Sequence, residues 1–134
     1  MAALKEIMLT IGIDSVEIER FQDWTHFSYN RLLQIFSKEE LDYAFSLETK
    51  KLERLAVRFA AKEAFYKALA PHVDSPLPFL RVCSSCSIIS SAAGIPVLKI
   101  SWEDLGLKSI LIVQASFTHT QTTATAVVVL IDKA

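Results

Sequence analysis

Residues 58–69 read RFAAKEAFYKAL, and apolar residues surround this segment on nearly every side. It belongs to a longer run, Lys50 to Leu69, that we predict to form one helix, with Thr49 as a candidate N-cap. A helix that is apolar all round is a buried helix. The Lys62–Glu63 pair in its middle is therefore unexpected, because charge in a buried segment needs a partner.

The sequence before this helix predicts one strand and further helices. Ile7 to Ile13 has the length and apolar character of a strand, and a helical pattern begins at Asp14. Ser28 is a candidate N-cap, and the segment from Ser37 to Glu40 has the serine and the glutamate of a capping box. We therefore expect a helix to begin after each of these two serines.

The sequence after this helix changes in character. Three prolines within residues 71–78 end the helical pattern. Gly94 marks a hairpin turn, and Gly106 closes a short helical turn. Four apolar, β-branched segments are predicted strands: residues 82–89, 97–100, 110–118 and 124–131. One strand, several helices and then antiparallel strands make an α+β fold, which we expect to be a single domain over residues 1–134.

The composition is that of a globular protein, with 51% apolar and 22% charged residues. The net charge of −1 argues against a nucleic-acid-binding protein, and any anionic ligand must be held by a local basic cluster. The apolar run at residues 7–13 has no basic leader, and the run at 124–131 is too short to span a bilayer. We therefore expect a soluble, cytoplasmic protein with no membrane partner.

Cys83 and Cys86 form a C-x-x-C motif, which is compatible with a zinc site or a redox site. Zinc would need two more ligands at suitable spacing, and the only histidines, His26, His72 and His119, are scattered. On a strand, positions three apart point to opposite faces. We therefore favour two unpaired, buried structural thiols.

Asp14 allows two interpretations. With Glu17 it fits the capping pattern of a helix that follows a strand, where a carboxylate accepts hydrogen bonds from the free amides of the first turn. Gly12 has no role in such a cap, and a glycine at the end of a strand indicates that something approaches the backbone closely. The second interpretation places Asp14 in a site.

Glu63 is the stronger signal of a site. An i,i+4 pair with Lys67 contributes only about 0.3–0.5 kcal/mol on an exposed helix, whereas a buried carboxylate without strong partners costs several kcal/mol. A divalent cation and a phosphate could offset that cost, and the surrounding alanines leave room for a ligand or another element. Asp14 and Glu63 together suit Mg²⁺, which takes one or two carboxylates and completes its shell with water and substrate phosphates. Lys62, Lys67 and Arg58 could hold the remaining phosphate charge.

Two segments resemble the signature motifs of the holo-[acyl-carrier-protein] synthases, a family of small phosphopantetheinyl transferases. They are GIDSVEIERF at residues 12–21 and RFAAKEAFYKA at residues 58–68. FSKEEL (36–41), GIP (94–96) and SFTHT (116–120) resemble further elements of the family in the same order. The resemblance covers nearly the whole chain, and the two motifs together are more specific than either alone.

This resemblance implies a fold and a function. Enzymes of the family move 4′-phosphopantetheine from coenzyme A to a serine hydroxyl of apo acyl-carrier protein and release adenosine 3′,5′-bisphosphate, a step that serves fatty acid biosynthesis. The resemblance also implies the phosphopantetheinyl transferase fold, Mg²⁺ as the cofactor, and a homotrimer whose active sites lie between neighbouring subunits.

The resemblance further implies a role for each matching residue. Asp14 and Glu63 would bind Mg²⁺ with the pyrophosphate of coenzyme A, and Lys67 would contact that pyrophosphate, so these three are the predicted catalytic residues. Arg20 would meet the acidic carrier protein, unless it is a surface arginine paired with Glu17 or a nearby aspartate. The other substrate-binding candidates, taken from the resemblance or from their charge, are Arg58, Lys62, His119, Thr120 and Lys50.

The sequence departs from the family at two places. Val57 stands where the family usually has a glycine before the arginine of the second motif, and residues 70–75 contain no glycine where the family has a glycine-containing loop near the phosphates. A homologue that binds coenzyme A or a carrier protein without efficient catalysis is therefore the alternative, and a structural trimer is a third hypothesis. Without the resemblance, Lys50 and His119 also fit a solvated helix start and a polar turn.

Overall fold

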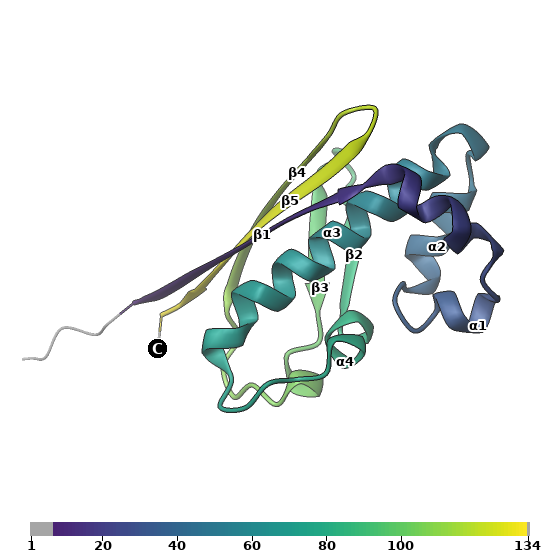
Figure 1. Cartoon of the computed structure of the whole chain (residues 1–134). Helices are drawn as coiled ribbons and strands as arrows, with labels where there is room; N and C mark the ends of the chain where they lie inside the picture. The colour runs from purple at the N-terminus through teal and green to yellow at the C-terminus, as the bar shows by residue number, and fades with distance from the viewer. Residues whose placement is uncertain (1–6, 134) are drawn as a thin grey trace, which may run out of the picture.

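The computed structural model describes residues 7–133 and places one long helix across a three-stranded sheet (Figure 1). The strands are β1 (Met8–Glu17), β2 (Cys86–Ser90), β3 (Pro96–Ile100), β4 (Ile112–His119) and β5 (Thr123–Asp132). The α-helices are α1 (Tyr29–Leu32), α2 (Lys38–Phe45), α3 (Lys51–Leu69) and α4 (Phe79–Ser84). The 3₁₀ helices are η1 (Ile18–His26), η2 (Glu48–Lys50), η3 (Ala70–His72) and η4 (Glu103–Leu105). The predicted α+β fold is confirmed.

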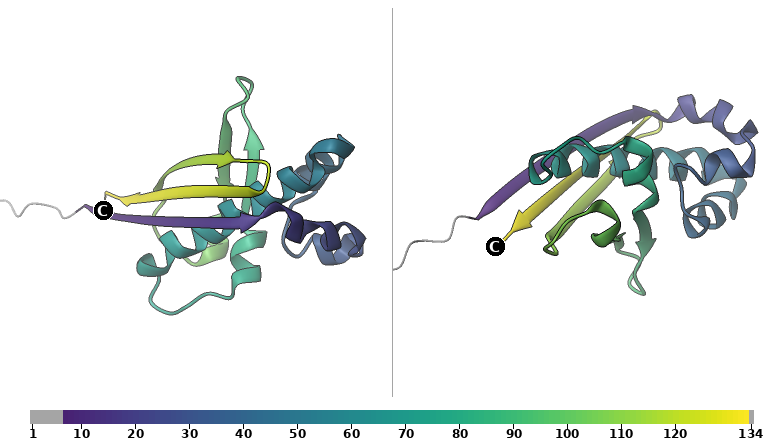
Figure 2. Two further views of the ribbon diagram at one scale, coloured as in Figure 1. Left: turned by 45° about the horizontal axis from the view of Figure 1, so that its top comes forward. Right: turned by 90° about the horizontal axis from the view of Figure 1, so that it is seen from below.

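The strands form two antiparallel sheets. In the larger sheet β5 lies between β1 and β4, with Gly12 opposite Val128 and Ser116 opposite Val127. In the smaller sheet β2 pairs with β3, and Gly94 takes the left-handed conformation that the predicted turn requires. Figure 2 shows this hairpin projecting away from the larger sheet, while α3 runs along one face of that sheet.

The inner face of the larger sheet packs on α3. Alternate residues of β5 point to this face and are fully buried: Ala124, Ala126, Val128 and Leu130. Gly12 of β1 touches the helix so closely that an added Cβ would lie 1.8 Å from the carbonyl oxygen of Ala64. The close approach predicted at Gly12 is therefore that of α3 itself, and the alanines of the helix make room for the sheet.

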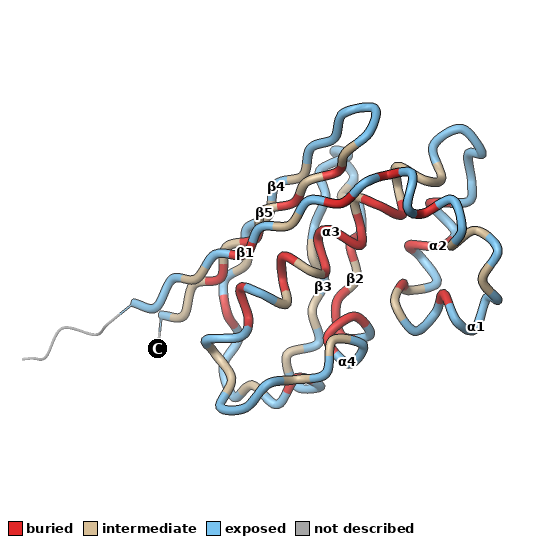
Figure 3. Tube along the Cα trace, viewed as in Figure 1, coloured by how far each residue is buried: buried red, intermediate tan, exposed pale blue. Residues whose placement is uncertain are grey.

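The outer face of the same sheet is apolar and open. Leu9, Ile11 and Ile13 of β1 are 53%, 62% and 57% exposed. Ile11 and Ile13 lie opposite Val129 and Val127 of β5, so the apolar surface continues onto the central strand. Figure 3 shows the contrast between the exposed length of β1 and the buried turns of α3.

Aromatic side chains join the N-terminal helices to α3. The ring of Trp24 lies 4.6 Å from the ring of Phe21 and 5.1 Å from that of Phe59, between centroids. The predicted caps that begin two of these helices are confirmed. Ser28 accepts a hydrogen bond from the third amide of its helix, and Ser37 forms a capping box with its glutamate.

None of the helices within residues 7–133 combines the length and the apolar character that a membrane span requires.

A buried ion pair connects four elements. Lys62 Nζ on α3 lies 2.9 Å from Glu40 Oε1 on α2, and both side chains are fully buried. The lysine also donates to the main-chain carbonyls of Cys83 and Cys86, and the other carboxylate oxygen of Glu40 accepts from the amide of Ile88. The pair therefore ties α2 and α3 to α4 and β2, and its polar atoms are hydrogen-bonded as buried charges require.

The predicted start of the first helix was wrong. The strand continues through Asp14 to Glu17, and Asp14 lies opposite Ala126 of β5. The first helix, η1, begins only at Ile18, so Asp14 is not its N-cap. Pairing with a strand at the far end of the sequence extends β1 beyond the point at which its local apolar pattern stops.

Two further boundaries also differ from the prediction. Residues 82–84 belong to α4 and not to a strand, because the helix begins after Pro78 and its spacing turns Val82 and Cys83 into the core. Helix α3 follows directly on η2 without a side-chain cap, so Thr49 is not its N-cap. In each case a helical turn occupies the segment, where the local pattern predicted a strand (residues 82–84) or an N-cap (Thr49).

Candidate active site

Asp14 and Lys67 form an ion pair where β1 crosses α3. Lys67 Nζ lies 3.2 Å from Asp14 Oδ1 and donates a 3.1 Å hydrogen bond to the carbonyl oxygen of Ile13. The second carboxylate oxygen, Asp14 Oδ2, is buried and has no hydrogen-bond partner among the described residues. Because buried polar atoms are almost always satisfied, this free oxygen marks a place for a ligand.

Glu63 lies one turn before Lys67 on α3 and is partly buried. Burial raises the pKa of its carboxyl group above the ordinary value, and the nearby charge of Asp14 raises this pKa further. Lys67 and Arg20 act in the opposite direction on the same pKa. We call Asp14, Glu63 and Lys67 the carboxylate site. Its two carboxylates are close enough to repel each other, and the lysine compensates only part of their charge.

The sequence prediction for Glu63 needs two corrections. The side chain is partly rather than largely buried. Its alternative role, an i,i+4 ion pair with Lys67, is not what the structure shows, since Lys67 of α3 instead pairs with Asp14 of β1. The predicted meeting of Asp14, Glu63 and Lys67 is nevertheless what the fold produces.

Arg20 of η1 lies beside the carboxylate site. Its guanidinium carbon is 5.2 Å from the ring centroid of Phe59 and 5.7 Å from that of Trp24, and the residue is exposed. Its charge lowers the pKa of Glu63, which places it within electrostatic reach of the site. Arg20 therefore rests on an aromatic surface with its charge open to solvent, rather than in an ion pair with Glu17.

A second charged cluster lines a pocket of about 330 Å³, which we call the guanidinium pocket. Arg58 is only 7% exposed there, and its Nε has no hydrogen-bond partner among the described residues. Burial lowers the pKa of the Arg58 guanidinium, and the neighbouring charge of Arg54 contributes in the same direction. Other charged residues of the lining are Lys50, Glu53 and His119. A buried cation with a free donor is suited to an anionic ligand.

His119 lines the guanidinium pocket from the end of β4, just before the turn to β5. Its Nε2 lies 2.8 Å from Glu53 Oε1, and its Nδ1 lies 3.2 Å from the carbonyl oxygen of Thr120. Lys50 Nζ is 3.7 Å from the same glutamate. The Thr120 hydroxyl accepts from the amide of Thr123 at 3.0 Å and does not line the pocket. Of these predicted substrate-binding residues, Lys50 and His119 reach the pocket, and Thr120 shapes the turn that carries His119.

The carboxylate site and the guanidinium pocket lie on different sides of α3. Arg58 and Glu63 are five residues apart, which corresponds to about 140° around a helix. The lining of the guanidinium pocket includes neither Asp14, Glu63 nor Lys67. One chain therefore does not bring all the predicted site residues into one cavity.

The prediction that Lys62 contacts the substrate was wrong. Its side chain is fully buried, and its ammonium group is already bound by Glu40 and by two main-chain carbonyls. The neighbouring Glu63 points to another side because successive residues are about 100° apart around a helix. Lys62 is thus a residue of the core.

The two cysteines are unpaired and buried, as predicted. Burial raises the pKa of each thiol to about 12, so both remain protonated and unreactive. Within residues 7–133 no group of three or more histidines, cysteines and acidic residues could hold a metal ion. Cys83 and Cys86 therefore have no further zinc ligands grouped with them within this part of the chain.

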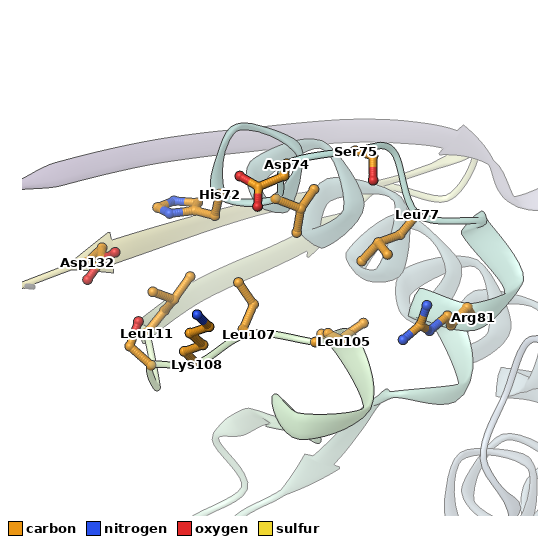
Figure 4. A pocket seen from close by; sticks show the side chains of 13 residues that line it. His72, Asp74, Ser75, Leu77, Arg81, Leu105, Leu107, Lys108, Leu111 and Asp132 are labelled. Carbon is orange, nitrogen blue, oxygen red and sulfur yellow. The ribbon is translucent and has the colours of Figure 1, made fainter.

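A further pocket of about 470 Å³ lies beyond the C-terminal end of α3 (Figure 4). His72, Asp74 and Arg81 project into it from the segment after α3, and Lys108 from the segment before β4. None of the residues predicted for the active site lines it. Its size alone does not make it the candidate site.

Among the residues of the guanidinium pocket that sequence reasoning missed are Tyr43, Glu53 and Arg54. Arg54 could have been found, because it lies four residues before Arg58 and therefore on the same side of α3. Tyr43 carries no such signal, since it reaches the pocket from another helix.

Comparison with known proteins gives a consistent result. The family model of the 4′-phosphopantetheinyl transferase superfamily matches residues 10–126. A curated relative from Treponema denticola, called holo-[acyl-carrier-protein] synthase, is 35% identical over 127 residues, which cover 92% of this chain and 98% of the relative. A protein of the same name from Treponema pallidum subsp. pallidum is 36% identical over 128 residues, covering 92% and 96%.

Solved structures agree in fold. The ACPS–CoA complex of Chronobacterium ammoniagenes matches with a TM-score of 0.77 and 26% identity, covering 92% of this chain and 96% of that one. A Helicobacter pylori holo-[acyl-carrier-protein] synthase in complex with coenzyme A matches with a TM-score of 0.70 and 31% identity, covering 90% and 98%.

Proposed function

The chain belongs to the holo-[acyl-carrier-protein] synthase family of the 4′-phosphopantetheinyl transferase superfamily, and from this premise we propose that it transfers 4′-phosphopantetheine from coenzyme A to a serine of apo acyl-carrier protein. The transfer releases adenosine 3′,5′-bisphosphate and depends on Mg²⁺. It would serve fatty acid biosynthesis in the cytoplasm. The observation that carries this proposal is the carboxylate site, in which Asp14, Glu63 and Lys67 meet from β1 and α3.

The residues of the carboxylate site fit a magnesium ion. Asp14 offers a buried oxygen without a partner, and the repulsion between Asp14 and Glu63 would be relieved by a cation between them. Mg²⁺ typically takes one or two carboxylates and leaves its other positions to water and phosphate oxygens. When bound, the ion would neutralise charge on the pyrophosphate of coenzyme A.

The side chains of the site would each perform a separate task in the transfer. Lys67 is held by Asp14 and by the main chain of Ile13, so its ammonium group is positioned before substrate arrives. There it can stabilise the negative charge that develops on the leaving bisphosphate. The serine hydroxyl of the carrier protein must lose its proton to an acceptor. A carboxylate of the site or a bound water molecule could accept it.

The guanidinium pocket is the proposed site for the nucleotide end of coenzyme A. The Nε of Arg58 is buried and has no hydrogen-bond partner among the described residues, and Arg58, Lys50 and His119 line the same pocket. Coenzyme A carries phosphates at both ends of its nucleotide, so one molecule could join two separate anion sites. Residues 70–75 contain no glycine where the family has a glycine-containing loop near the phosphates, so Arg58, Lys50 and His119 would carry more of the phosphate binding.

A homotrimer would join the two sites. Because the carboxylate site and the guanidinium pocket lie on different sides of α3, neighbouring subunits must face each other for one coenzyme A to contact both. The open apolar face around Ile11 and Ile13 offers the surface for such an assembly. Sedimentation of the wild type should give a trimer, and Ile11→Glu should give monomers; a wild-type monomer at micromolar concentration would contradict the shared site.

One assay tests the proposed function directly. Purified protein is mixed with coenzyme A, Mg²⁺ and an apo acyl-carrier protein, and the carrier protein is weighed by mass spectrometry. We expect a mass gain of one phosphopantetheine arm, which is lost when Mg²⁺ is chelated. Binding of coenzyme A or the carrier protein without any mass gain would favour the non-catalytic homologue, and no binding of either would leave only a structural role.

A further inference from the structure

We propose that Tyr43 positions Arg54 and Arg58 for a phosphate monoester, and that the protein thereby selects coenzyme A over its 3′-dephospho form. The inference rests on the proposed function, because it concerns the recognition of coenzyme A. It assigns a positioning role to a residue of α2 that does not belong to the carboxylate site.

The ring of Tyr43 gathers both guanidinium groups. The guanidinium carbon of Arg54 lies 3.9 Å from the ring centroid, and that of Arg58 lies 4.3 Å from it. Both distances are well within the range of a cation–π interaction. Arg54 Nη1 also donates to the main-chain carbonyl of Tyr43 at 2.7 Å and to Ser46 Oγ at 3.1 Å. Arg54 is thus fixed by the end of α2.

Arg58 depends more strongly on this ring. Its hydrogen bond, from Nη1 to the carbonyl oxygen of Arg54, is 3.4 Å long and therefore weak. Its Nε is buried without a partner within residues 7–133. The aromatic ring of Tyr43 is then the main contact that holds the guanidinium plane, and it leaves the N–H donors of Arg58 free for a ligand.

The charges of the guanidinium pocket fit a dianion. Lys50, Arg54 and Arg58 are cations, and Glu53 is the only acidic residue that residues 7–133 contribute to the lining. Apart from His119, the formal charges of these residues sum to +2. A phosphate monoester carries about −1.5 to −2 at pH 7, whereas a diester carries a single charge. In coenzyme A the 3′-phosphate is the monoester, and dephospho-coenzyme A differs only by its loss.

Two substitutions of Tyr43 distinguish the contribution of its aromatic ring from that of its hydroxyl group. Tyr43→Phe keeps the aromatic face and loses only the hydroxyl, which makes no hydrogen bond to the described part of the chain. Tyr43→Leu removes the aromatic face. The side chain is 42% exposed, so we expect both variants to fold. Tyr29→Leu is the control, because Tyr29 is a similarly exposed tyrosine that does not line the pocket.

Steady-state transfer is measured with coenzyme A and with 3′-dephospho-coenzyme A as donors. For the wild type, KM should be much lower for coenzyme A. Tyr43→Leu should raise the KM for coenzyme A by about 5- to 30-fold, as expected for two cation–π contacts, and should leave the KM for the dephospho form nearly unchanged. Tyr43→Phe and Tyr29→Leu should behave as the wild type, and the KM for carrier protein should not move in any variant.

Calorimetric binding of adenosine 3′,5′-bisphosphate supplies a readout that does not depend on transfer. Its affinity should fall in Tyr43→Leu by the same factor as KM rises. The inference is overturned if Tyr43→Leu affects both donors equally, if Tyr43→Phe is as impaired as Tyr43→Leu, or if the wild type does not distinguish the donors. A wild type that binds neither coenzyme A nor the bisphosphate would instead overturn the proposed function.

Discussion

Lys62 and Glu63 are neighbours in the sequence and belong to two opposite regions of the molecule. Lys62 lies in the core, where Glu40 and two carbonyl groups satisfy its ammonium group. Glu63 lies at the edge of α3, where Asp14 repels it and the free oxygen of Asp14 has no partner among the described residues. The difference shows how to separate structural from functional charge: a satisfied buried charge supports the fold, and an unsatisfied one awaits a ligand.

The largest expected effect comes from breaking the satisfied pair. Lys62→Met should lower the free energy of unfolding by about 3–5 kcal/mol, because it leaves the Glu40 carboxylate buried without its cation. Urea unfolding followed by circular dichroism measures this change. Lys38→Met is the matched control, since it removes a lysine from an exposed pair with Asp42 and should change little. Equal stability of the two variants would show that the buried pair does not hold the fold.

The next largest effect is expected from the two carboxylates of the carboxylate site. Asp14→Asn and Glu63→Gln should each lower kcat/KM for transfer by at least about 100-fold at limiting Mg²⁺, because each removes a proposed ligand charge. The urea unfolding of both variants should remain close to that of the wild type. Near-normal turnover in either variant would contradict the metal assignment. Unfolding of both variants would show that these carboxylates, like the Lys62–Glu40 pair, support the fold.

A substitution of Arg20 tests whether the surface beside the carboxylate site binds the carrier protein. Arg20→Glu should raise the KM for an acidic carrier protein by about 10-fold and leave the KM for coenzyme A nearly unchanged. The wild-type rate should fall with added salt, because attraction between exposed charges is screened beyond about 10 Å at 0.1 M. If instead the variant loses coenzyme A binding to the same extent, Arg20 acts on the carboxylate site and not on the carrier protein.

The smallest effect is a gain in stability from Glu63→Gln. The folded-state pKa of Glu63 is raised above its ordinary value of 4.5, so the fold prefers the protonated carboxyl. The contribution of Glu63 to stability is therefore most favourable below that ordinary value and is lost as the pH rises through the folded-state pKa. Glu63→Gln removes this loss, so its Tm should exceed that of the wild type at pH 7 by about 1–2 °C, a small gain because solvent screens the half-exposed group. The difference should vanish near pH 4; a gain of the same size at both pH values would have another cause.

The sequence predicted correctly those parts of the fold that depend on interactions between residues close together in the chain. The capping box at Ser37 and the left-handed turn at Gly94 each depend on a few consecutive residues. The extension of β1 through Asp14 depends on β5, and the burial of Lys62 depends on Glu40, a residue of another helix. Neither partner can be identified from the spacing of the residues around it.

The same distinction applies to the candidate site. Asp14, Glu63 and Lys67 were predicted together because the paired motifs contain all three, and the fold brings them together. Tyr43 was missed because its role arises only where the end of α2 meets α3. Helical periodicity gave the direction of Arg58, but it could not show that the guanidinium would be buried beside an aromatic ring.

The contact between Gly12 and Ala64 has a consequence for ion discrimination. It fixes how closely β1 approaches α3, and Asp14 and Glu63 stand on these two elements just beyond the contact. The missing Cβ of Gly12 thus helps to set the distance between the two elements that carry the carboxylates. Mg²⁺ has a small ionic radius and requires ligands at about 2.0–2.1 Å, whereas Ca²⁺ accepts about 2.3–2.6 Å. Gly12, which lies outside the proposed ligand set, would therefore influence the spacing of the ligands of the proposed ion, and the ratio of transfer rates with Mg²⁺ and Ca²⁺ in Gly12→Ala would measure that influence.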